Sequence, residues 1–439
     1  MPAQKLKPRI GIACLSSPLE VGADKAARME QKLSEVLKSI GCEVVEAGSV
    51  DSPEKAIAAG KKLAEKHVHG VAFGAVSWFE DYLVVDLLEE CNVPIFLWSF
   101  PGVETGALCG SQQLTAYLKQ LDYSYSCAFG DVNDEAAIKK IQSWAKATAL
   151  KKLLRTSKIG IVGHRIAGMV EAAVNEIQLK KSLGPRVIYF DLAKILGISA
   201  QLSNSDVQKK WEELTKKANK CDVSEKEGVD SIKIYKALRE IITQNNLNAL
   251  AFGCYPDNMG CACIAASLLA DENIPLACEG DVNAAVGQLI LSSLTGRPTH
   301  NTDWLEPLDD GTIVLTHCGS GSLSLADSEG KITLGHVRLM KQGVCAMFPS
   351  KPGIVTMLNL LPRGEHYQIA MLKGEALHTE MVFPGNPLRV KFQAPTMAIL
   401  DWIHNEGIGH HWVVGYDDIS NEIRMLVSIT KNNRLIELV

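Results

Sequence analysis

The chain has 439 residues, of which 46% are hydrophobic, and 45 basic against 50 acidic residues give a formal net charge of −5 at pH 7. This length predicts roughly three domains, and the near-balanced charge excludes the strongly basic surface of nucleic-acid-binding or anionic-membrane-binding proteins. Residues 1–8 include basic side chains but no apolar core of a signal peptide, and no apolar run approaches the about 20 residues that span a bilayer. We therefore expect a cytoplasmic protein that acts on a small molecule, without nucleic-acid or membrane partners.

The first part of the chain alternates short apolar strands with amphipathic helices. Apolar residues recur every three or four positions before Gly41, which predicts a helix that this glycine ends. Ser52 and Pro53 mark the start of the next helix, as an N-cap followed by a first-turn proline. Strands are predicted at residues 9–14, 42–45, 69–75 and 94–98. The alternation predicts a parallel sheet with helices on both faces.

The same alternation restarts after a polar helix predicted at residues 133–155. Residues 203–242 are rich in charge and helical in pattern, and we interpret them as a solvated face. Strands are predicted at residues 158–163, 186–190, 248–252 and 274–277. This segment therefore predicts a second domain of the same class.

The pattern changes after Gly311, where short strand-like runs alternate with Gly and Pro turns. A helix is predicted at residues 396–406, and strands at residues 312–315, 331–339, 354–361 and 381–383. The sequence thus predicts an α/β protein: two Rossmann-like, doubly wound parallel-sheet domains followed by a β-rich, barrel-like C-terminal domain. We place the domains at residues 1–130, 131–299 and 300–439.

Twelve cysteines are spread along the chain. A chain of the cytoplasm keeps its thiols reduced, which argues against a disulfide framework. Cys261 and Cys263 form the closest pair but have no second pair at zinc-site spacing, so we interpret them as structural.

Two acidic residues follow the strand predicted at residues 274–277. Glu279 and Asp281 are expected at the carboxyl end of a parallel sheet, where ligands bind. The structural alternative is N-capping of the next helix, which accounts for Asp281 better than for Glu279 because one cap is enough. Asp303 follows in a predicted linker, where an acid is ordinarily a turn former.

Histidines complete this set of polar residues. His317 precedes the Gly319–Ser322 loop, whose small residues allow close approach of a ligand, although a core or loop histidine is the usual role. His410 and His411 are adjacent, so in a strand they would point to opposite faces and only one would reach a given site. Carboxylates and imidazoles at strand edges make a plausible site for a divalent metal and for proton transfer.

The chain resembles the L-fucose/L-arabinose isomerase family of aldose–ketose isomerases, and within it the L-fucose isomerase branch. The resemblance rests on residues 277–281, on the position of Asp303, on residues 316–322 and on residues 409–411. It spans most of the chain from about residue 10, and it is strongest from residue 248 on. At 439 residues the chain is shorter than typical members, which leaves the identity of the sugar open.

The resemblance implies a metal-dependent isomerase, usually with Mn²⁺, that converts a pentose or a 6-deoxyhexose through a cis-enediol intermediate. It implies Glu279, Asp303 and one histidine of the doublet as metal ligands; we favour His411, and His317 is a further candidate ligand. Glu279 and Asp303 would also be the catalytic acid/base pair, in an order that the sequence does not settle. The resemblance further implies a homo-oligomer, a trimer or a hexamer.

Residues that contact the sugar are also implied by the resemblance. Arg165 and Met169 follow a strand of the second domain, and His410 is a further candidate for substrate binding. Trp78 follows a strand of the first domain, where a neighbouring subunit's residue can complete a site in this family. For Trp78, packing in the domain core is the equally strong alternative.

Two other classes of function compete with the isomerase. A non-catalytic sugar-binding or sensor protein can also have two Rossmann-like domains, but this class predicts a signal peptide or a DNA-binding module and leaves Asp303 and His411 without a role. A nucleotide-dependent enzyme is disfavoured because no GxGxxG follows the first strand and no GxxxxGK[ST] occurs.

Overall fold

A computed structural model describes residues 6–438. The chain divides into two compact units: residues 6–153 together with 421–431, here called the N-terminal unit, and residues 154–420 together with those from 432 on, called the C-terminal unit. The chain therefore passes from the C-terminal unit to the N-terminal unit and back near its end. Each unit is described by itself below.

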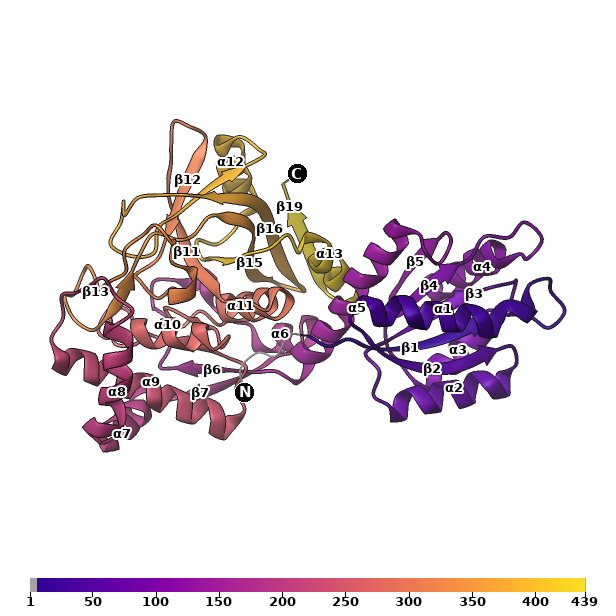
Figure 1. Ribbon diagram of the computed structural model, residues 1–439, viewed down its shortest axis with the longest axis horizontal. Helices are drawn as coiled ribbons and strands as arrows, with labels where there is room; N and C mark the ends of the chain where they lie inside the picture. The colour runs from indigo at the N-terminus through magenta and orange to yellow at the C-terminus, as the bar shows by residue number, and fades with distance from the viewer. Residues whose placement is uncertain (1–5, 439) are drawn as a thin grey trace. The chain divides into compact units, whose positions relative to one another are not determined.

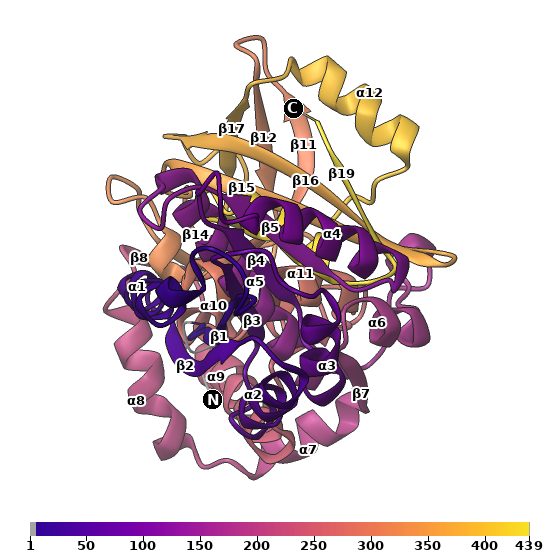
Figure 2. The ribbon, with the colours of Figure 1, turned by 90° about the vertical axis from the view of Figure 1, so that its right-hand side faces the viewer.

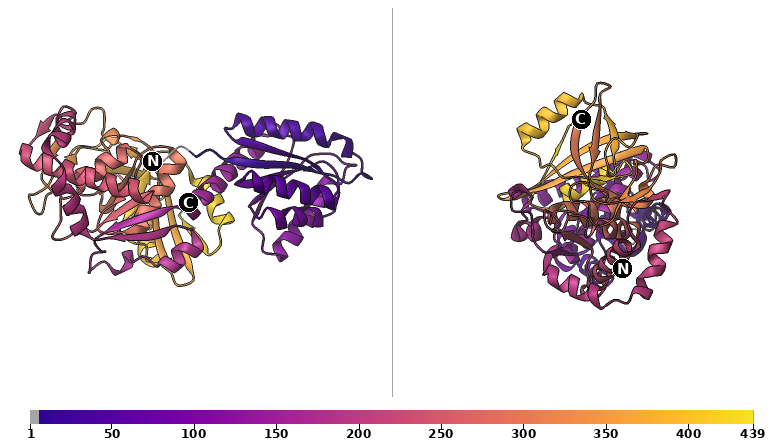
Figure 3. Two further views of the ribbon diagram at one scale, coloured as in Figure 1. Left: turned by 90° about the horizontal axis from the view of Figure 1, so that it is seen from below. Right: turned by 90° about the vertical axis from the view of Figure 1, so that its left-hand side faces the viewer.

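The N-terminal unit contains a five-stranded parallel sheet in the order β2-β1-β3-β4-β5, with helices on both faces (Figure 1; Figure 3, left). One face is packed by apolar residues of α2, α3 and α4. The elements are β1 Arg9–Leu15, η1 Ala23–Lys25, α1 Ala26–Ser39, β2 Glu43–Val50, α2 Pro53–Glu65, β3 Gly70–Ala75, α3 Tyr82–Glu90, β4 Ile95–Ser99, α4 Ala107–Gln120, β5 Tyr125–Phe129, α5 Glu135–Thr156 and α13 Ser420–Ile429.

Local signals in the sequence account for the helix ends of this unit. The Ser52 side chain accepts a hydrogen bond from the Lys55 amide, and Pro53 is the first residue of α2, as the sequence predicts. Gly41, just past the end of α1, adopts a left-handed φ of 89°, which glycine tolerates without strain. The strand β5 was not predicted.

The C-terminal unit begins with a four-stranded parallel sheet in the order β10-β9-β6-β7. Its elements are β6 Lys158–Val162, η2 Val170–Ala172, α6 Glu176–Ser182, β7 Arg186–Phe190, α7 Leu192–Gln201, α8 Asn204–Thr215, β8 Lys220–Cys221, α9 Glu225–Asn245, β9 Ala249–Phe252, α10 Cys263–Asp271, β10 Leu276–Ala277 and α11 Val282–Thr295. The interpretation of residues 203–242 as a solvated face is wrong in part. Helix α9 buries an apolar stripe that includes Ile232, Leu238 and Ile241, because its charged residues occupy only the opposite side.

The unit also contains a small three-stranded sheet, β14-β13-β8, and a closed antiparallel barrel of six strands in the order β15-β18-β11-β12-β17-β16, which β15 and β16 close (Figure 2). Strand β19 is added parallel to β16. Trp412, Met357 and Leu388 are among its buried core residues. The elements are β11 Thr299–Pro307, β12 Thr312–Thr316, η3 Leu323–Leu325, β13 Thr333–Gly335, β14 Cys345–Met347, β15 Gly353–Arg363, β16 His366–Leu377, β17 Leu388–Phe392, α12 Thr396–Glu406, β18 Trp412–Gly415 and β19 Asn433–Glu437. The predicted fold class, two parallel-sheet α/β domains and a β-barrel, is thus confirmed; the bounds 1–130, 131–299 and 300–439 stay a prediction.

Three details of the predicted β-rich domain are wrong. Residues 381–383 form no strand and lie in the loop between β16 and β17. The strand predicted at residues 331–339 is reduced to β13, Thr333–Gly335, which pairs with β14 and β8 and lies outside the barrel. Asp303 lies within β11 and not in a linker, because β11 pairs with β12 on one side and β18 on the other. This strand is hard to recognise from the sequence, because its first four residues are polar although they are buried: Thr299, His300, Asn301 and Thr302.

Helix α11 joins the parallel sheet to the barrel, and every residue from Val282 to Leu294 is buried. It packs against β9 and β10 on one side and against β11, β15 and β18 on the other. A Cβ atom at Gly287 would lie 2.8 Å from a methyl group of Val413, so glycine lets α11 approach the barrel closely. Glu279 and Asp281, which directly precede this helix, therefore face the end of the barrel.

None of the helices in the described part of the chain combines the length and the apolar character that crossing a membrane requires. All twelve cysteines are free thiols.

Candidate metal centre

Three neighbouring barrel strands bring together the residues that the sequence singled out. Asp303 on β11 is paired with Thr316, the last residue of β12, so His317 follows directly beside it. Thr302 is paired with Trp412, the first residue of β18, so His411 lies on the other side of Asp303. Residues separated by more than 100 positions therefore meet because β11 runs between β12 and β18 in the barrel.

Glu279 reaches the same place from the parallel sheet. It follows β10 with a left-handed φ of 63°, a conformation that is uncommon and costly for a residue with a side chain. Its carbonyl oxygen accepts a hydrogen bond from the Ile166 amide of the loop after β6, at 3.3 Å. Gly280 follows with φ 70°, and a Cβ atom there would lie 2.6 Å from the His164 carbonyl oxygen, so only glycine fits under this loop.

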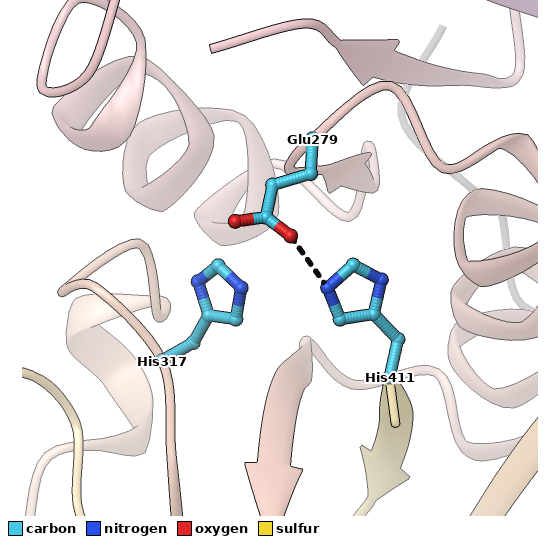
Figure 4. Close-up of side chains that lie close together, drawn as sticks. All are labelled: Glu279, His317 and His411. Carbon is cyan, nitrogen blue, oxygen red and sulfur yellow. Dashed lines mark hydrogen bonds and ion pairs between the residues drawn. The ribbon is translucent and has the colours of Figure 1, made fainter. Parts of the chain in front are cut away.

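Glu279, His317 and His411 place one possible ligand atom each within 4.8 Å of one another, and Asp303, His410 and His411 form a second such group. Figure 4 shows the Glu279 carboxylate with the two imidazole rings beside it. The His411 Nε2 atom lies 2.9 Å from Glu279 Oε2 and 3.9 Å from Asp303 Oδ1. His317 Nε2 lies 3.9 Å from Asp303 Oδ2. Carboxylate oxygens and imidazole nitrogens thus converge on one small volume.

The donors of this site suit a hard divalent cation. His317 and His411 are each 4% exposed, and the side chain of Glu279 is 14% exposed. Asp303 Oδ1 and His317 Nδ1 are buried atoms without a hydrogen-bond partner. Since buried polar atoms are ordinarily satisfied, a bound cation for the carboxylate and a water for the imidazole would complete the site. An oxygen-rich set with one or two imidazoles fits Mn²⁺.

The charges within the site favour the ionised forms of Glu279, His411 and His317. Burial alone would raise the pKa of Glu279, but the hydrogen bond to His411 and the charge of His317 hold that pKa below its ordinary value. Burial alone would lower the pKa of His411, but its hydrogen bonds to Asp281 and Glu279 raise that pKa well above the ordinary value. The pKa of His317 is raised to about 9, against the effect of burial, by Cys318 and Asp303.

Asp281 and Asn359 hold His411 in place, and neither role was predicted. Asp281 Oδ2 accepts a hydrogen bond of 2.9 Å from His411 Nδ1, while its Oδ1 caps α11 by accepting from the Ala284 amide. The Asn359 side chain donates to the His411 carbonyl oxygen at 2.7 Å. The sequence hints at a special role for Asn359, because it is the one polar residue among the apolar residues 357–361. For Asp281 the sequence indicates only a role as the N-cap of the following helix.

The predicted sugar contacts of the C-terminal unit come from the loop after β6 and from the residue that precedes His411. Arg165 is half-buried in the loop after β6, and its guanidinium donates to carbonyl oxygens of Ile166 and Ala167. Met169 is half-buried at the end of the same loop. His410 is exposed, with its ring 4.0 Å from that of His411, and its Nδ1 lies 2.7 Å from Glu171 Oε1.

Trp78 belongs to the N-terminal unit. It is half-buried in the segment after β3, and its indole donates a hydrogen bond of 3.2 Å to the side chain of Gln113 on α4. Its Cβ atom would lie 3.0 Å from a Cβ atom at Gly106. Trp78 is therefore packed at the carboxyl end of the first sheet without being fully buried.

No family model matches the chain. The chain is 24% identical over 370 residues to a sulfoquinovose isomerase of Alkalicoccus urumqiensis, a match that covers 81% of this chain and 83% of the relative. It is 25% identical over 377 residues to a sulfoquinovose isomerase of Priestia aryabhattai, covering 82% and 84%. A third, from Clostridium sp. (strain MSTE9), is 24% identical and covers 77% and 80%. The chain is thus a distant homologue of sugar isomerases.

Solved structures give only a weak likeness. A solute-binding protein from Burkholderia multivorans is 13% identical, covers 66% of this chain and 95% of its own, and has a TM-score of 0.19. One from Actinobacillus succinogenes 130z, with bound D-allose, is 10% identical, covers 66% and 92%, and also has a TM-score of 0.19. Similarity at this level carries no inference about this chain.

Proposed function

We propose that the protein is a divalent-metal-dependent aldose–ketose isomerase in which Glu279, Asp303 and His411 hold the ion and His317 is a further ligand. The observation that carries this proposal is the convergence of Glu279, His317 and His411 within 4.8 Å, with Asp303 Oδ1 beside them, buried and without a hydrogen-bond partner. Distant homology to sugar isomerases supports it independently. We propose Mn²⁺ as the ion, as the resemblance to the L-fucose isomerase branch implies.

Within this proposal the two carboxylates move the protons. A bound divalent cation would supply Lewis acidity that polarises the substrate's carbonyl group and neighbouring hydroxyl. The lowered pKa of Glu279 keeps its carboxylate ionised at neutral pH, as a ligand or a base requires. One of Glu279 and Asp303 removes the proton from C2 of the open-chain aldose while O1 gains a proton, which gives the cis-enediol. The other then delivers a proton to C1 while the O2 hydroxyl gives up its own, so the sugar loses and gains two protons in all. As neutral rings, His317 and His411 would help to hold the cation, whose charge would stabilise the developing enediolate oxygens.

We propose a 6-deoxyhexose as the substrate, with the sulfonated sugar in the relatives' name as the first to test. Sulfoquinovose is a 6-deoxyglucose that carries a sulfonate on C6, so it belongs to the substrate class that the resemblance implies. Arg165 is the cation that we propose for the sulfonate: its guanidinium contacts only carbonyl oxygens of its own loop, and no ion pair of Arg165 occurs within the described residues. Met169 and His410 are the further proposed sugar contacts.

We also propose, as the resemblance implies, that Trp78 contacts the sugar from a neighbouring subunit of a trimer or hexamer. The proposed location is the cytoplasm.

The deciding experiment measures metal content and isomerase activity on the same preparation. The purified protein is analysed for metals, then assayed for ketose formation with sulfoquinovose, 6-deoxyglucose, L-fucose and D-arabinose, with added MnCl₂ and with a chelator. We expect turnover of at least one aldose that the chelator abolishes and Mn²⁺ restores. Sugar binding without turnover of any aldose would instead favour the non-catalytic sugar-binding alternative.

The role of Arg165 is tested by a matched pair of substrates. Arg165→Gln should lower kcat/KM for sulfoquinovose by roughly tenfold or more, which is the loss of one charged hydrogen bond, and leave 6-deoxyglucose unaffected. An equal loss on both sugars would mean that Arg165 does not recognise the sulfonate.

A further inference from the structure

Asp281 is nearly inaccessible to solvent, at 4% exposure, and it uses its two carboxylate oxygens for two different elements. Oδ1 accepts a hydrogen bond of 2.9 Å from the Ala284 amide and caps α11. Oδ2 accepts a hydrogen bond of 2.9 Å from Nδ1 of His411, 130 positions along the chain. We propose that Asp281 is a positioning residue that fixes the ring orientation and the tautomer of His411 for metal binding, an inference that rests on the proposed function.

The carboxylate determines which nitrogen of His411 is available to an ion. An ionised carboxylate can only accept hydrogen bonds, so the Nδ1 atom beside it must carry the hydrogen. In the neutral ring the lone pair then belongs to Nε2, the atom that lies 2.9 Å from Glu279 Oε2 and 3.9 Å from Asp303 Oδ1. Asp281 therefore directs the only free lone pair of His411 toward the two proposed carboxylate ligands.

A second contact limits the backbone of the same residue. Asn359, itself 5% exposed, donates from its side-chain amide to the His411 carbonyl oxygen at 2.7 Å, and its side-chain oxygen accepts from the Gly409 amide at 3.3 Å. Asn359 thus holds the backbone between Gly409 and His411, while Asp281 and Glu279 contact the two ring nitrogens. Without Asp281 the Nδ1 atom has no acceptor, so the ring can adopt the other tautomer.

Helix capping by itself does not explain an aspartate at this position. Asparagine and serine cap helices about as well as aspartate does. Serine, however, is too short to reach both partners. Asparagine has one acceptor oxygen for two donors, so its amide nitrogen would face either the Ala284 amide or the His411 Nδ1 atom. Aspartate has two acceptor oxygens, so it can accept hydrogen bonds from the Ala284 amide and from His411 Nδ1 at the same time.

This difference gives a direct test in the full-length protein. Asp281→Ser keeps a helix cap but removes the contact with His411, and Asp281→Asn keeps the shape but has one acceptor too few. Ser224→Ala is the matched control, because it removes the capping box of α9 in the same unit without touching the site. Calorimetric titration with MnCl₂ gives the dissociation constant of each variant, and thermal unfolding without metal shows that each is folded.

We expect Asp281→Ser and Asp281→Asn to bind Mn²⁺ roughly 10- to 100-fold more weakly, the usual effect of losing a carboxylate that orients a ligating histidine. Ser224→Ala should lower the unfolding temperature and leave the Mn²⁺ dissociation constant unchanged. Nitrogen-15 NMR of the histidine rings at alkaline pH should show hydrogen on Nδ1 of His411 in the unmodified chain and a mixture of tautomers in Asp281→Ser.

The outcomes separate this inference from the proposed function. Unchanged Mn²⁺ affinity in Asp281→Ser would reduce Asp281 to a helix cap and overturn the inference while the isomerase proposal stands. If the unmodified protein binds no Mn²⁺, the proposed metal centre fails, and the ring tautomers alone decide whether Asp281 positions His411.

Discussion

Glu279 is the residue on which the proposed chemistry depends most. Its left-handed backbone is held between Gly280 and the loop after β6, and its side chain reaches His411 across 132 positions. Glu279→Gln keeps the size of the side chain but removes the charge that a ligand or a base needs. We expect kcat to fall by about 10²- to 10⁴-fold and Mn²⁺ binding to weaken, as measured by steady-state assay and metal analysis.

The matched control for this variant is Glu171→Gln. Glu171 is also a carboxylate beside a histidine of the doublet, but its partner is His410. We expect Glu171→Gln to retain Mn²⁺ binding and circular dichroism like that of the unmodified chain. Substantial isomerase activity in Glu279→Gln would remove Glu279 from the mechanism.

The protonation of His411 predicts how metal binding depends on pH. In the metal-free chain burial opposes the charge on His411, but hydrogen bonds to Asp281 and Glu279 raise its pKa, so both ring nitrogens carry protons at neutral pH. An ion needs the lone pair of Nε2, so binding must release a proton. Apparent Mn²⁺ affinity should therefore rise by about tenfold per pH unit below that raised pKa, and more steeply if His317, whose pKa is raised to about 9, also loses a proton to bind the ion.

Calorimetry in buffers of different protonation enthalpy measures this proton release directly. An Mn²⁺ affinity that does not change between pH 6 and pH 8, with no proton released, would show that His411 is neutral in the metal-free protein or is not a ligand.

Single residues of the site were predictable to different degrees. The resemblance and the order of motifs singled out Glu279, Asp303, His317 and His411, and the structure brings all four together. The contacts of Asp281 and Asn359 with His411 were not predictable, because each joins residues 52 or more positions apart that only the closed barrel makes neighbours.

At the scale of elements, prediction succeeded where hydrophobic periodicity is plain. The helix predicted at residues 396–406 is α12, Thr396–Glu406, and the strand predicted at 186–190 is β7, Arg186–Phe190. It failed for β11, whose buried residues are polar and match neither the alternating nor the continuous apolar pattern of a strand. The site depends on β11, so its assembly was the least predictable part of the fold.

His300 on β11 gives this element a predictable response to acid. Burial, and to a smaller extent the charge of Lys351, lowers the pKa of His300 from 6.5 to about 4. The unfolded chain binds a proton here below pH 6.5 and the folded chain does not until about pH 4, so stability is lost as pH falls through this interval. The loss approaches about 3 kcal/mol, at about 1.4 kcal/mol per pKa unit.

His300→Gln removes this titration, so its free energy of unfolding should fall less between pH 7 and pH 4.5 than that of the unmodified chain, by about 2 to 3 kcal/mol. Denaturant unfolding at the two pH values measures the difference. The exposed His404 on α12 provides the control, since His404→Gln should leave the pH dependence as it is. Equal pH dependence in the His300 variant would mean that His300 is protonated in the fold.

At the scale of the molecule, the proposed metal centre belongs to one unit only, and neither unit is continuous in sequence. All proposed metal ligands, together with Asp281 and Asn359, belong to the C-terminal unit, whereas α13 leaves that unit to join the N-terminal one. Within the N-terminal unit, Lys146 on α5 forms an ion pair of 3.0 Å with Glu422 of α13, and Ile423, Leu426 and Ile429 are fully or nearly fully buried. The N-terminal unit is thus completed by a helix that follows the whole barrel in sequence.

This arrangement predicts that damage to α13 is confined to one unit. Leu426→Ala removes a side chain that is 0% exposed, which should cost about 2 to 5 kcal/mol. Hydrogen exchange should therefore become faster in β1–β5 and in α13, while the protection of the barrel strands and the Mn²⁺ dissociation constant stay unchanged. Equal loss of protection in both units would instead show that they unfold as one cooperative body, and that the metal centre shares the stability of α13.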